Sequence, residues 1–229
     1  MKIHYIINPQ RQEYHNGLKG FKLANCNHPP LIPIPVGING VKIFLKKWLS
    51  TANFEHNRVL LMGLGGSLSP QYNVGDLTLY QNCLYAGNFV NNYLKKFDFE
   101  LNSWLKNELN LKSFLVLGLT CDRLINLATE KQEIFKQTRT EVIDMEGYIL
   151  LDELAKIKVK LAILRVISDD VNHNIPDLNS AFSPEGKLKP FTLAFGLLFN
   201  PVAGLRLIKH SLKAIKILEK VAFNLANIL

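Results

Sequence analysis

The sequence predicts an α/β fold of three layers (α/β/α), in which helices cover both faces of a central mixed sheet. Along most of the chain, apolar runs typical of strands alternate with amphipathic segments typical of helices. The 229 residues, with 48% apolar composition, are enough for one well-buried core and short for two. The last part of the chain has helical spacing throughout. We therefore expect a single domain over residues 1–229, with C-terminal helices that form a basic extension from about residue 187.

Strands are expected where short apolar runs are bounded by turn residues. Pro33 and Pro35 confine the second predicted strand to an edge of the sheet, because proline has no N–H to donate. The run from 159 to 168 has the strongest strand character. The predicted strands span residues 2–7, 31–36, 57–62, 75–80, 114–119, 141–144 and 159–168.

Helices are expected where apolar residues recur every three or four positions. Asp98 is the predicted N-cap of one of them, because its carboxylate can accept from a free N–H of the first turn. The Gly37–Gly40 segment predicts a turn, and Arg11 and Glu13 are assigned to a loop after the first strand. The predicted helices span residues 41–49, 98–109, 127–137, 145–154 and the C-terminal part from near Gly204.

The charge of the chain is concentrated near its C-terminus. The formal net charge is +8, and from residue 187 onward seven Lys/Arg residues stand against one acid, Glu219. These cations recur at helical spacing among Leu and Ile, which predicts an amphipathic helix with a basic face. That face fits either a helix docked on the core or a peripheral contact with an anionic membrane, with the apolar stretch 191–199 entering the interface. Nucleic acid is not expected, since no aromatic residues interleave the basic face.

Cysteine and histidine usage indicates a reducing compartment without a metal site. Cys26, Cys83 and Cys121 are an odd number, widely spaced and without a C-x-x-C pair. The six histidines show no ligand spacing, so neither a metal nor another cofactor is expected. The apolar run at the N-terminus is too short for a signal peptide, and no run is long enough to span a membrane. We expect a cytoplasmic protein, with contact at a membrane surface left open.

A glycine-rich segment from Gly63 to Leu68 directly follows a predicted strand. It is not a dinucleotide-binding fingerprint, because Leu68 stands where the last glycine is required, and no Gly-Lys-Ser/Thr follows as in a P-loop. Two interpretations stay open. The segment is either a tight turn or a backbone cradle whose N–H groups approach an anion or a sugar.

Two predicted strands end abruptly in carboxylates. One runs into Asp144 and Glu146, and the other runs from Arg165 into Asp169 and Asp170. Buried carboxylates are costly, so they are usually paired, hydrogen-bonded or used in chemistry. The structural alternative is that these acids stabilise or cap the N-termini of the elements that follow.

In this order and spacing, the segments resemble the nucleoside phosphorylase/nucleosidase family. The resemblance runs from residue 1 to about residue 175. It rests on the glycines at 37–40 and 63–66, Val74-Gly75-Asp76, Asp144-Met145-Glu146 and the 165–169 segment. Within the family, the 63–70 segment, the Asp-Met-Glu form and the basic tail resemble hopanoid-associated phosphorylases. Those proteins are proposed to remove adenine from adenosylhopane, a lipid-linked nucleoside.

The resemblance implies cleavage of the N-glycosidic bond of a purine nucleoside. Asp169, with Ser168 beside it, would be the general acid at purine N7. Glu146 would bind the ribose 2′-hydroxyl, and Met145 would pack against sugar and base, with Asp144 in the same ribose- and base-binding motif. Breaking this bond leaves positive charge on the ribose and negative charge on the base, which suits a carboxylate near the sugar and an acid at the base. The family also implies a homo-oligomer.

The resemblance favours phosphorolysis, with phosphate as a co-substrate, although the residues themselves do not decide between phosphate and water as the nucleophile. The glycine segment has no arginine, which phosphorolytic members carry, and Leu64 stands where serine is common. Arg11 is then the best remaining phosphate ligand, and Glu13 lies near where nucleosidases keep a water-activating glutamate. The backbone around the nucleophile would be held by Gly63, Leu64, Gly65 and Gly66. Two alternatives stay open: a hydrolytic methylthioadenosine/adenosylhomocysteine-type nucleosidase, and an inactive nucleoside- or lipid-binding module.

Overall fold

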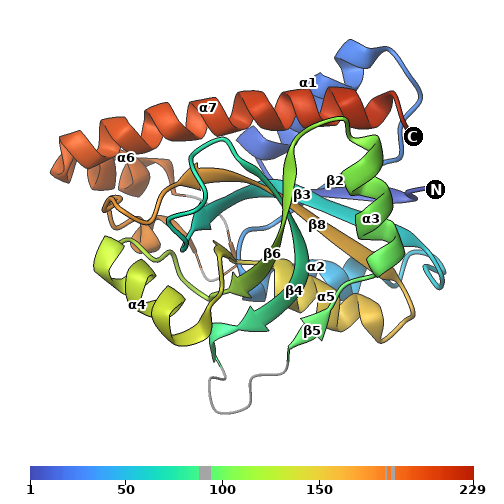
Figure 1. Ribbon diagram of the computed structural model, residues 1–229, viewed down its shortest axis with the longest axis horizontal. Coiled ribbons are helices and arrows are strands. Elements are labelled where there is room, and N and C mark those ends of the chain that lie inside the picture. Colours follow the sequence, from blue (N-terminus) through green and yellow to red (C-terminus); the bar gives the residue numbers. More distant parts are fainter. Residues whose placement is uncertain (88–93, 184, 187–188) are drawn as a thin grey trace.

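The computed structural model has a mixed sheet between two layers of helices (Figure 1). It describes residues 1–87, 94–183, 185–186 and 189–229, so Lys187, at the start of the predicted extension, lies outside the described residues. Within them the sheet has eight strands in the order β2-β1-β3-β7-β6-β4-β5, and β8 pairs with both β3 and β4. The predicted α/β fold class is confirmed.

Most predicted elements are present, with ends shifted by a few residues. The strands are β1 (Tyr5–Pro9), β2 (Leu31–Ile34), β3 (Arg58–Ser67), β4 (Leu77–Tyr85), β5 (Lys95–Lys96), β6 (Ser113–Thr120), β7 (Val142–Asp144) and β8 (Lys160–Asp169). The helices are α1 (Gln12–Ala24), α2 (Ile38–Trp48), α3 (Phe99–Glu108), α4 (Ala128–Thr138), α5 (Gly147–Ala155), α6 (Pro190–Phe199) and α7 (Pro201–Ala226), with a short 3₁₀ helix η2 (Asn179–Ala181).

The sheet curls, and its two longest strands, β3 and β8, finish at the same edge. β3 runs parallel to β8, but antiparallel to β7 at its carboxyl end, and β4 runs antiparallel to β8. The pairings β3-β7-β6-β4-β8 therefore close on themselves. In the parallel ladder Gly66 pairs with Asp169, after a register shift between Gly65 and Gly66. The ends of β3, β7 and β8 thus meet at one place, and the carboxylates that follow the strands gather there.

Helices cover both faces of the sheet. Helices α2 and α5 pack on one face, around residues such as Ile7 and Ile163. Helices α1, α3 and α7 cover the other face, where Leu218 and Ala222 of α7 are fully buried. Gly20 lets α7 lie directly against α1, because a Cβ there would sit 2.2 Å from the Glu219 carbonyl oxygen. The C-terminal helix is therefore docked on the core along much of its length.

Two local predictions are confirmed. Strand β2, which contains Pro33, lies at the edge of the sheet. The Asp98 carboxylate accepts a hydrogen bond of 2.8 Å from the Leu101 N–H and caps α3. In the described parts of the chain, no helix combines the length and apolar character needed to cross a bilayer.

Three local predictions are wrong, and one open interpretation is excluded. The segment after β1 is helix α1 rather than a loop, so Glu13 lies in a helical first turn, while Arg11 stays outside the helix at its N-cap. The tight-turn interpretation of the glycine-rich segment is excluded, because this segment is the end of β3. In the Gly37–Gly40 segment, only Gly37, with φ of 81°, is outside helix α2. The last helix begins at Pro201 rather than near Gly204, capped by the Asn200 side chain, and α6 precedes it as a separate helix.

Candidate active site

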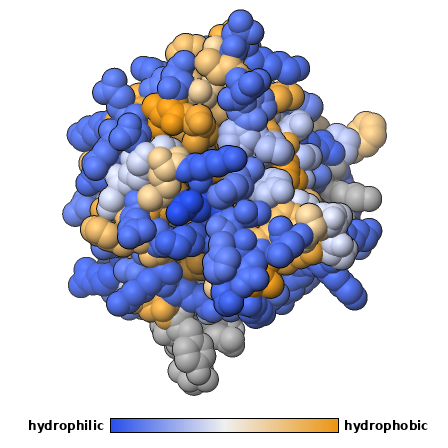
Figure 2. Space-filling model, turned by 90° about the vertical axis from the view of Figure 1, so that its right-hand side faces the viewer, coloured by the Kyte–Doolittle hydropathy of each residue, from blue (hydrophilic) through white to orange (hydrophobic). Residues whose placement is uncertain are grey.

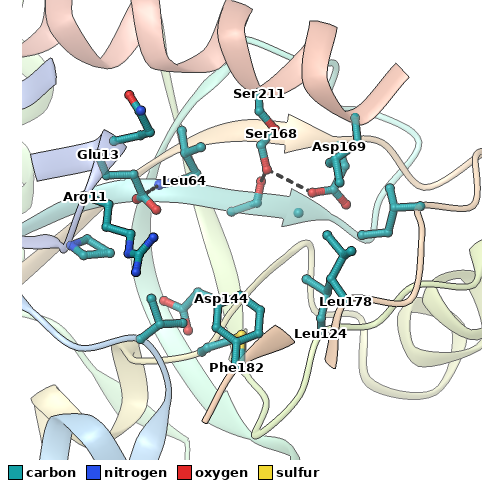
Figure 3. A pocket seen from close by; sticks show the side chains of 18 of the residues that line it. Arg11, Glu13, Leu64, Leu124, Asp144, Ser168, Asp169, Leu178, Phe182 and Ser211 are labelled. Atoms are coloured by element: carbon teal, nitrogen blue, oxygen red, sulfur yellow. Dashed lines mark hydrogen bonds between the residues drawn. The ribbon is translucent and has the colours of Figure 1, made fainter. Parts of the chain in front are cut away.

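A cavity of about 560 Å³ lies where the ends of β1, β3, β7 and β8 meet. Its size is within the range of small-molecule sites. One wall carries polar groups from the strand ends, and the other is largely apolar, from α6, α7 and the residues on either side of η2, Leu178 and Phe182. Figure 3 shows Arg11 and Glu13 on one side of this space and Ser168 and Asp169 on the other. Nearly all predicted site residues line the cavity, namely Arg11, Glu13, Leu64, Gly65, Gly66, Asp144, Met145, Glu146, Ser168 and Asp169.

The carboxylate of Asp169 is held by a buried lysine and a serine. Lys131 of α4 is completely buried and pairs with Asp169 Oδ2, while its ammonium also donates to the Asp170 carbonyl oxygen at 3.0 Å. The Ser168 hydroxyl lies 2.9 Å from Asp169 Oδ1 and 3.2 Å from the Gly65 carbonyl oxygen, so it can donate to either. These contacts fix the orientation of the carboxylate at the cavity wall.

The glycines of β3 make room for charged side chains. A Cβ at Gly66 would lie 2.8 Å from Asp169 Oδ2. A Cβ at Gly63 would lie 2.4 Å from Glu13 Oε2 and 2.6 Å from Arg165 Nη1. Gly63 itself is not among the residues that line the cavity, although Glu13, for which it makes room, is. The Leu64 N–H donates to Glu13 Oε2 at 2.6 Å, so this backbone group of the segment contacts a side chain of the protein.

A buried arginine organises the acidic motif. Arg165 of β8 has no exposed side-chain surface, and it donates to Asp144 Oδ2 from Nε at 3.1 Å and from Nη2 at 2.8 Å. Its Nη2 also donates to Glu146 Oε2 at 2.9 Å. Burial alone would lower the pKa of Arg165, but the two carboxylates raise it above its ordinary value, so the side chain is a permanent cation.

Both carboxylate oxygens of Asp144 already accept hydrogen bonds from groups within the protein. Its Oδ1 accepts from the Thr120 hydroxyl at 2.6 Å and from the Gly147 N–H at 3.2 Å, and its Oδ2 is held by Arg165. The side chain is fully buried. We infer that Asp144 positions Arg165 and the start of α5, rather than binding a ligand itself.

Glu146 keeps hydrogen-bonding capacity for a ligand. Its Oε1 accepts from the Gly37 N–H at 3.0 Å and its Oε2 accepts from Arg165, which leaves further lone pairs on both oxygens. Burial raises the pKa of Glu146, against the opposing charge of Arg165. Met145 beside it is partly exposed and lines the cavity. Two adjacent residues thus offer a carboxylate and an apolar surface to the same space.

Glu13 is held at the opposite side by the first turn of α1 and the end of β3. Desolvation raises the pKa of Glu13 to about 8, although the charge of Arg165 and the Leu64 N–H both favour the ionised form. Arg11, which directly precedes the helix, has φ of 71° and ψ of −122°. Such a backbone conformation is rare for a residue with a side chain and is typical of functional loops.

Sequence reasoning missed two functional candidates. Arg165 had a signal, because it is the one charged residue inside the apolar run from Leu161 to Ile167, and a buried charge needs partners. Lys131 had none, since its predicted helix gives no indication of which lysine faces the core. In the described part of the chain, no group of three or more His, Cys, Asp or Glu residues could hold a metal ion.

A mixed sheet closed in part on itself, with carboxylates gathered around a cavity at its strand ends, defines an α/β protein of the nucleoside phosphorylase type. The chain belongs to the phosphorylase superfamily, whose family model matches residues 45–189. No curated protein sequence matches it.

Solved structures with the same fold include several nucleosidases. One is the 5′-methylthioadenosine/S-adenosylhomocysteine nucleosidase of Helicobacter pylori, with a TM-score of 0.69, 14% identity, and coverage of 98% of this chain and 97% of the other. The corresponding Campylobacter jejuni enzyme has a TM-score of 0.62, 20% identity, and coverage of 92% and 98%. Helicobacter pylori futalosine hydrolase has a TM-score of 0.63, 15% identity, and coverage of 95% of each chain. At these identities the comparison shows a shared fold.

Proposed function

We propose that the protein cleaves the N-glycosidic bond of a purine nucleoside and releases the base. The observation that carries this proposal is the pair of carboxylate sites on opposite sides of one cavity, with Asp169 on one side and Glu13 on the other. An acid at the base and a carboxylate near the sugar stabilise the charges that develop as this bond breaks. Asp169 serves as the general acid at the base, and Glu146 binds the ribose.

Water is the nucleophile that the site supports best. Glu13 Oε2 already accepts from the Leu64 N–H, a backbone donor that a phosphate would otherwise use. The Glu13 pKa of about 8 lies close to neutrality, where a general base is most effective. Phosphorolysis is the second candidate. It is favoured by Arg11 at the cavity wall and by Arg165 Nη1, a buried donor without a hydrogen-bond partner.

The apolar wall of the cavity supports a substrate with an apolar 5′ substituent. Leu193 and Leu197 of α6 and Leu207 and Ile215 of α7 line this wall. We propose a lipid-linked adenosine of the adenosylhopane type, which an enzyme would meet at a membrane surface. A methylthioadenosine/adenosylhomocysteine-type substrate is the alternative, and a binding module without catalysis is the rival from another class.

The test is an adenine-release assay on adenosine, 5′-methylthioadenosine and 5′-decylthioadenosine, with and without phosphate. Free ribose, or its 5′-substituted form, indicates hydrolysis, and the corresponding 1-phosphate indicates phosphorolysis. We expect kcat/KM to rise with the length of the 5′ chain. If the protein is a binding module without catalysis, calorimetry should detect binding of the same compounds while no adenine is released.

Replacing Glu13 by Gln should lower kcat by about 10²- to 10⁴-fold, because general-base assistance is lost. In the wild type the ionised form of Glu13 is the active one. The value of kcat/KM should therefore rise with pH up to about 8 and then level off. The variant should lose this rise. Glu108→Gln, an exposed carboxylate on α3, is the matched control. A Glu13 variant that keeps the wild-type profile would remove Glu13 from the mechanism.

The same variant gives a readout that does not depend on activity. The folded-state pKa of Glu13 is raised, so the unfolded chain loses this proton at lower pH than the folded chain does. Between about pH 4.5 and pH 8 the wild type should lose stability relative to Glu13→Gln. Thermal melting of both proteins at pH 5 and pH 8.5 measures the difference, and an equal gap at both pH values would contradict the raised pKa.

Replacing Glu146 by Gln should reduce cleavage of ribonucleosides by about 10- to 100-fold, because a charged hydrogen bond to the 2′-hydroxyl is weakened. Binding of free adenine should change little, and 2′-deoxynucleosides, which lack the hydroxyl, should be affected less. Steady-state kinetics on adenosine and 2′-deoxyadenosine measure this. An equal loss on both substrates would mean that Glu146 does not bind the 2′-hydroxyl.

A further inference from the structure

Helix α6 is apolar on all sides but is not buried. Thr192 is the one polar side chain in its sequence PFTLAFGLLF, and the helix has no buried residue. The exposed fractions are 81% for Phe191, 62% for Phe195 and 87% for Phe199. A helix that is apolar all round normally lies inside a protein or a membrane. Helix α6 therefore presents apolar surface that nothing in the described chain covers.

The exposed apolar surface continues from α6 onto the start of α7. Leu198, Val202 and Leu205 are each about 70% exposed, with values of 72%, 68% and 70%. We call Phe191, Phe195, Leu198, Phe199, Val202 and Leu205 the apolar ridge. It lies at the left end of the molecule in Figure 1. By contrast, the face toward the viewer in Figure 2, on the side of both termini, is mostly hydrophilic, and its apolar residues form small patches.

Within residues 190–218 the charged side chains are all cations, while the exposed Asp177 of the neighbouring segment lies beside Gly196 of α6. Lys209 and Lys216 of α7 are exposed, and between residues 190 and 218 the chain has no Asp or Glu. Such a flank is complementary to an anionic surface. A second copy of the chain is disfavoured as the occupant, because a symmetric pairing through this face would bring the like charges together.

Helix α6 is too short to cross a bilayer. The helix has 10 residues, which span about 15 Å, or half the hydrocarbon thickness of a membrane. Helices that meet a membrane without crossing it lie in the plane of the interface, and cations beside them favour an anionic surface.

We propose that the apolar ridge and its basic flank dock on an anionic lipid bilayer, with α6 lying in the plane of the interface. The cavity opens beside this surface. Leu193 and Leu197 of α6 line the cavity, and Ile208 and Leu212 both line it and are exposed, with fractions of 42% and 56%. Docking therefore brings the mouth of the active-site cavity to the lipid interface. The inference goes beyond the proposed reaction, since docking needs no turnover.

Co-sedimentation with lipid vesicles tests the proposal. The wild type should bind phosphatidylglycerol vesicles at low salt, and should bind them less at high salt, because salt screens the cations. The wild type should bind phosphatidylcholine vesicles at least tenfold more weakly than phosphatidylglycerol vesicles. Phe195→Ser/Phe199→Ser should reduce binding to phosphatidylglycerol at least tenfold. Phe99→Ser is the matched control, because Phe99 is 75% exposed on α3, away from the ridge.

The charged flank is tested by Lys209→Gln/Lys216→Gln, which should weaken binding about tenfold or more at low salt and flatten the salt dependence. Lys213 is left unchanged, because it donates to the Val74 carbonyl oxygen at 2.7 Å. The control is Lys46→Gln/Lys47→Gln, at the exposed end of α2.

Three results would overturn the proposal. They are no binding to phosphatidylglycerol at low salt, unchanged binding by the double Phe variant, and a solution dimer that the double Phe variant dissociates in sedimentation velocity. Circular dichroism and thermal melting of each variant establish that it is folded. Adenine release from adenosine in solution is measured in parallel, so failure of docking and failure of the proposed reaction are distinguished.

Discussion

Replacing Asp169 by Asn should lower kcat for adenine release by about 10²-fold or more, because an amide cannot act as the general acid. The amide oxygen can still accept a hydrogen bond from Lys131, but the buried ammonium loses its countercharge, so the variant should melt at a lower temperature than wild type while keeping most of its substrate affinity. The expected pattern is therefore a large fall in kcat with a small change in KM, measured by steady-state kinetics on adenosine. Thermal melting establishes that the fold is retained.

Asp170→Asn is the matched control for this experiment. Asp170 follows directly in the chain, but its carboxylate contacts His173 rather than the cavity. This variant should keep activity within about twofold of wild type, as is usual for a change outside the reacting centre. Near-wild-type turnover by Asp169→Asn would remove Asp169 from the chemistry. Equal losses in both variants would indicate a general effect of charge at the end of β8.

The sequence predicted much of the fold because strand signals were local. Continuous apolar runs located β6 and β8, and the prolines of β2 placed it correctly at the edge. Helix α1 was missed because its sequence, QEYHNGLKGFKLA, is polar on average and has two glycines, and its helical state depends on packing against α7. The closure of the sheet through β8 depends on pairings between distant segments, which no local pattern reports.

The sequence predicted which residues belong to the candidate site, but not the contacts that these residues make with one another. The strand-end carboxylates identified Asp144, Glu146 and Asp169 as members of one site, and all three line one cavity. The sequence did not report how the glycines are packed, because this depends on side chains far away in sequence. Gly63 makes room for Glu13 and Arg165, and this crowding exists only after β1, β3 and β8 are side by side.

Arg165 contributes both to the stability of the fold and to the candidate site. Among the described residues, it is the one cation that pairs with both Asp144 and Glu146. Removing one member of a buried ion pair leaves an uncompensated charge, which costs much more than the loss of an exposed pair. The arginine therefore allows the fold to carry two buried carboxylates, one of which still has lone pairs for a ligand.

Replacing Arg165 by Met should lower the free energy of unfolding by about 3–5 kcal/mol, because the side chain keeps its approximate volume but loses its charge. Urea denaturation at pH 8 measures this. Arg123→Met is the matched control, since Arg123 makes an exposed ion pair with Glu130, and its loss should cost less than about 1 kcal/mol.

The deficit of Arg165→Met should depend on pH in a defined direction. Without the arginine, Asp144 and Glu146 repel each other in a buried space, so protonation of one of them relieves the repulsion. The folded variant should then take up protons at higher pH than its unfolded chain, and its stability relative to wild type should recover as the pH falls from 8 to 5. A deficit that is the same at both pH values would mean that packing, rather than charge compensation, is what Arg165 supplies.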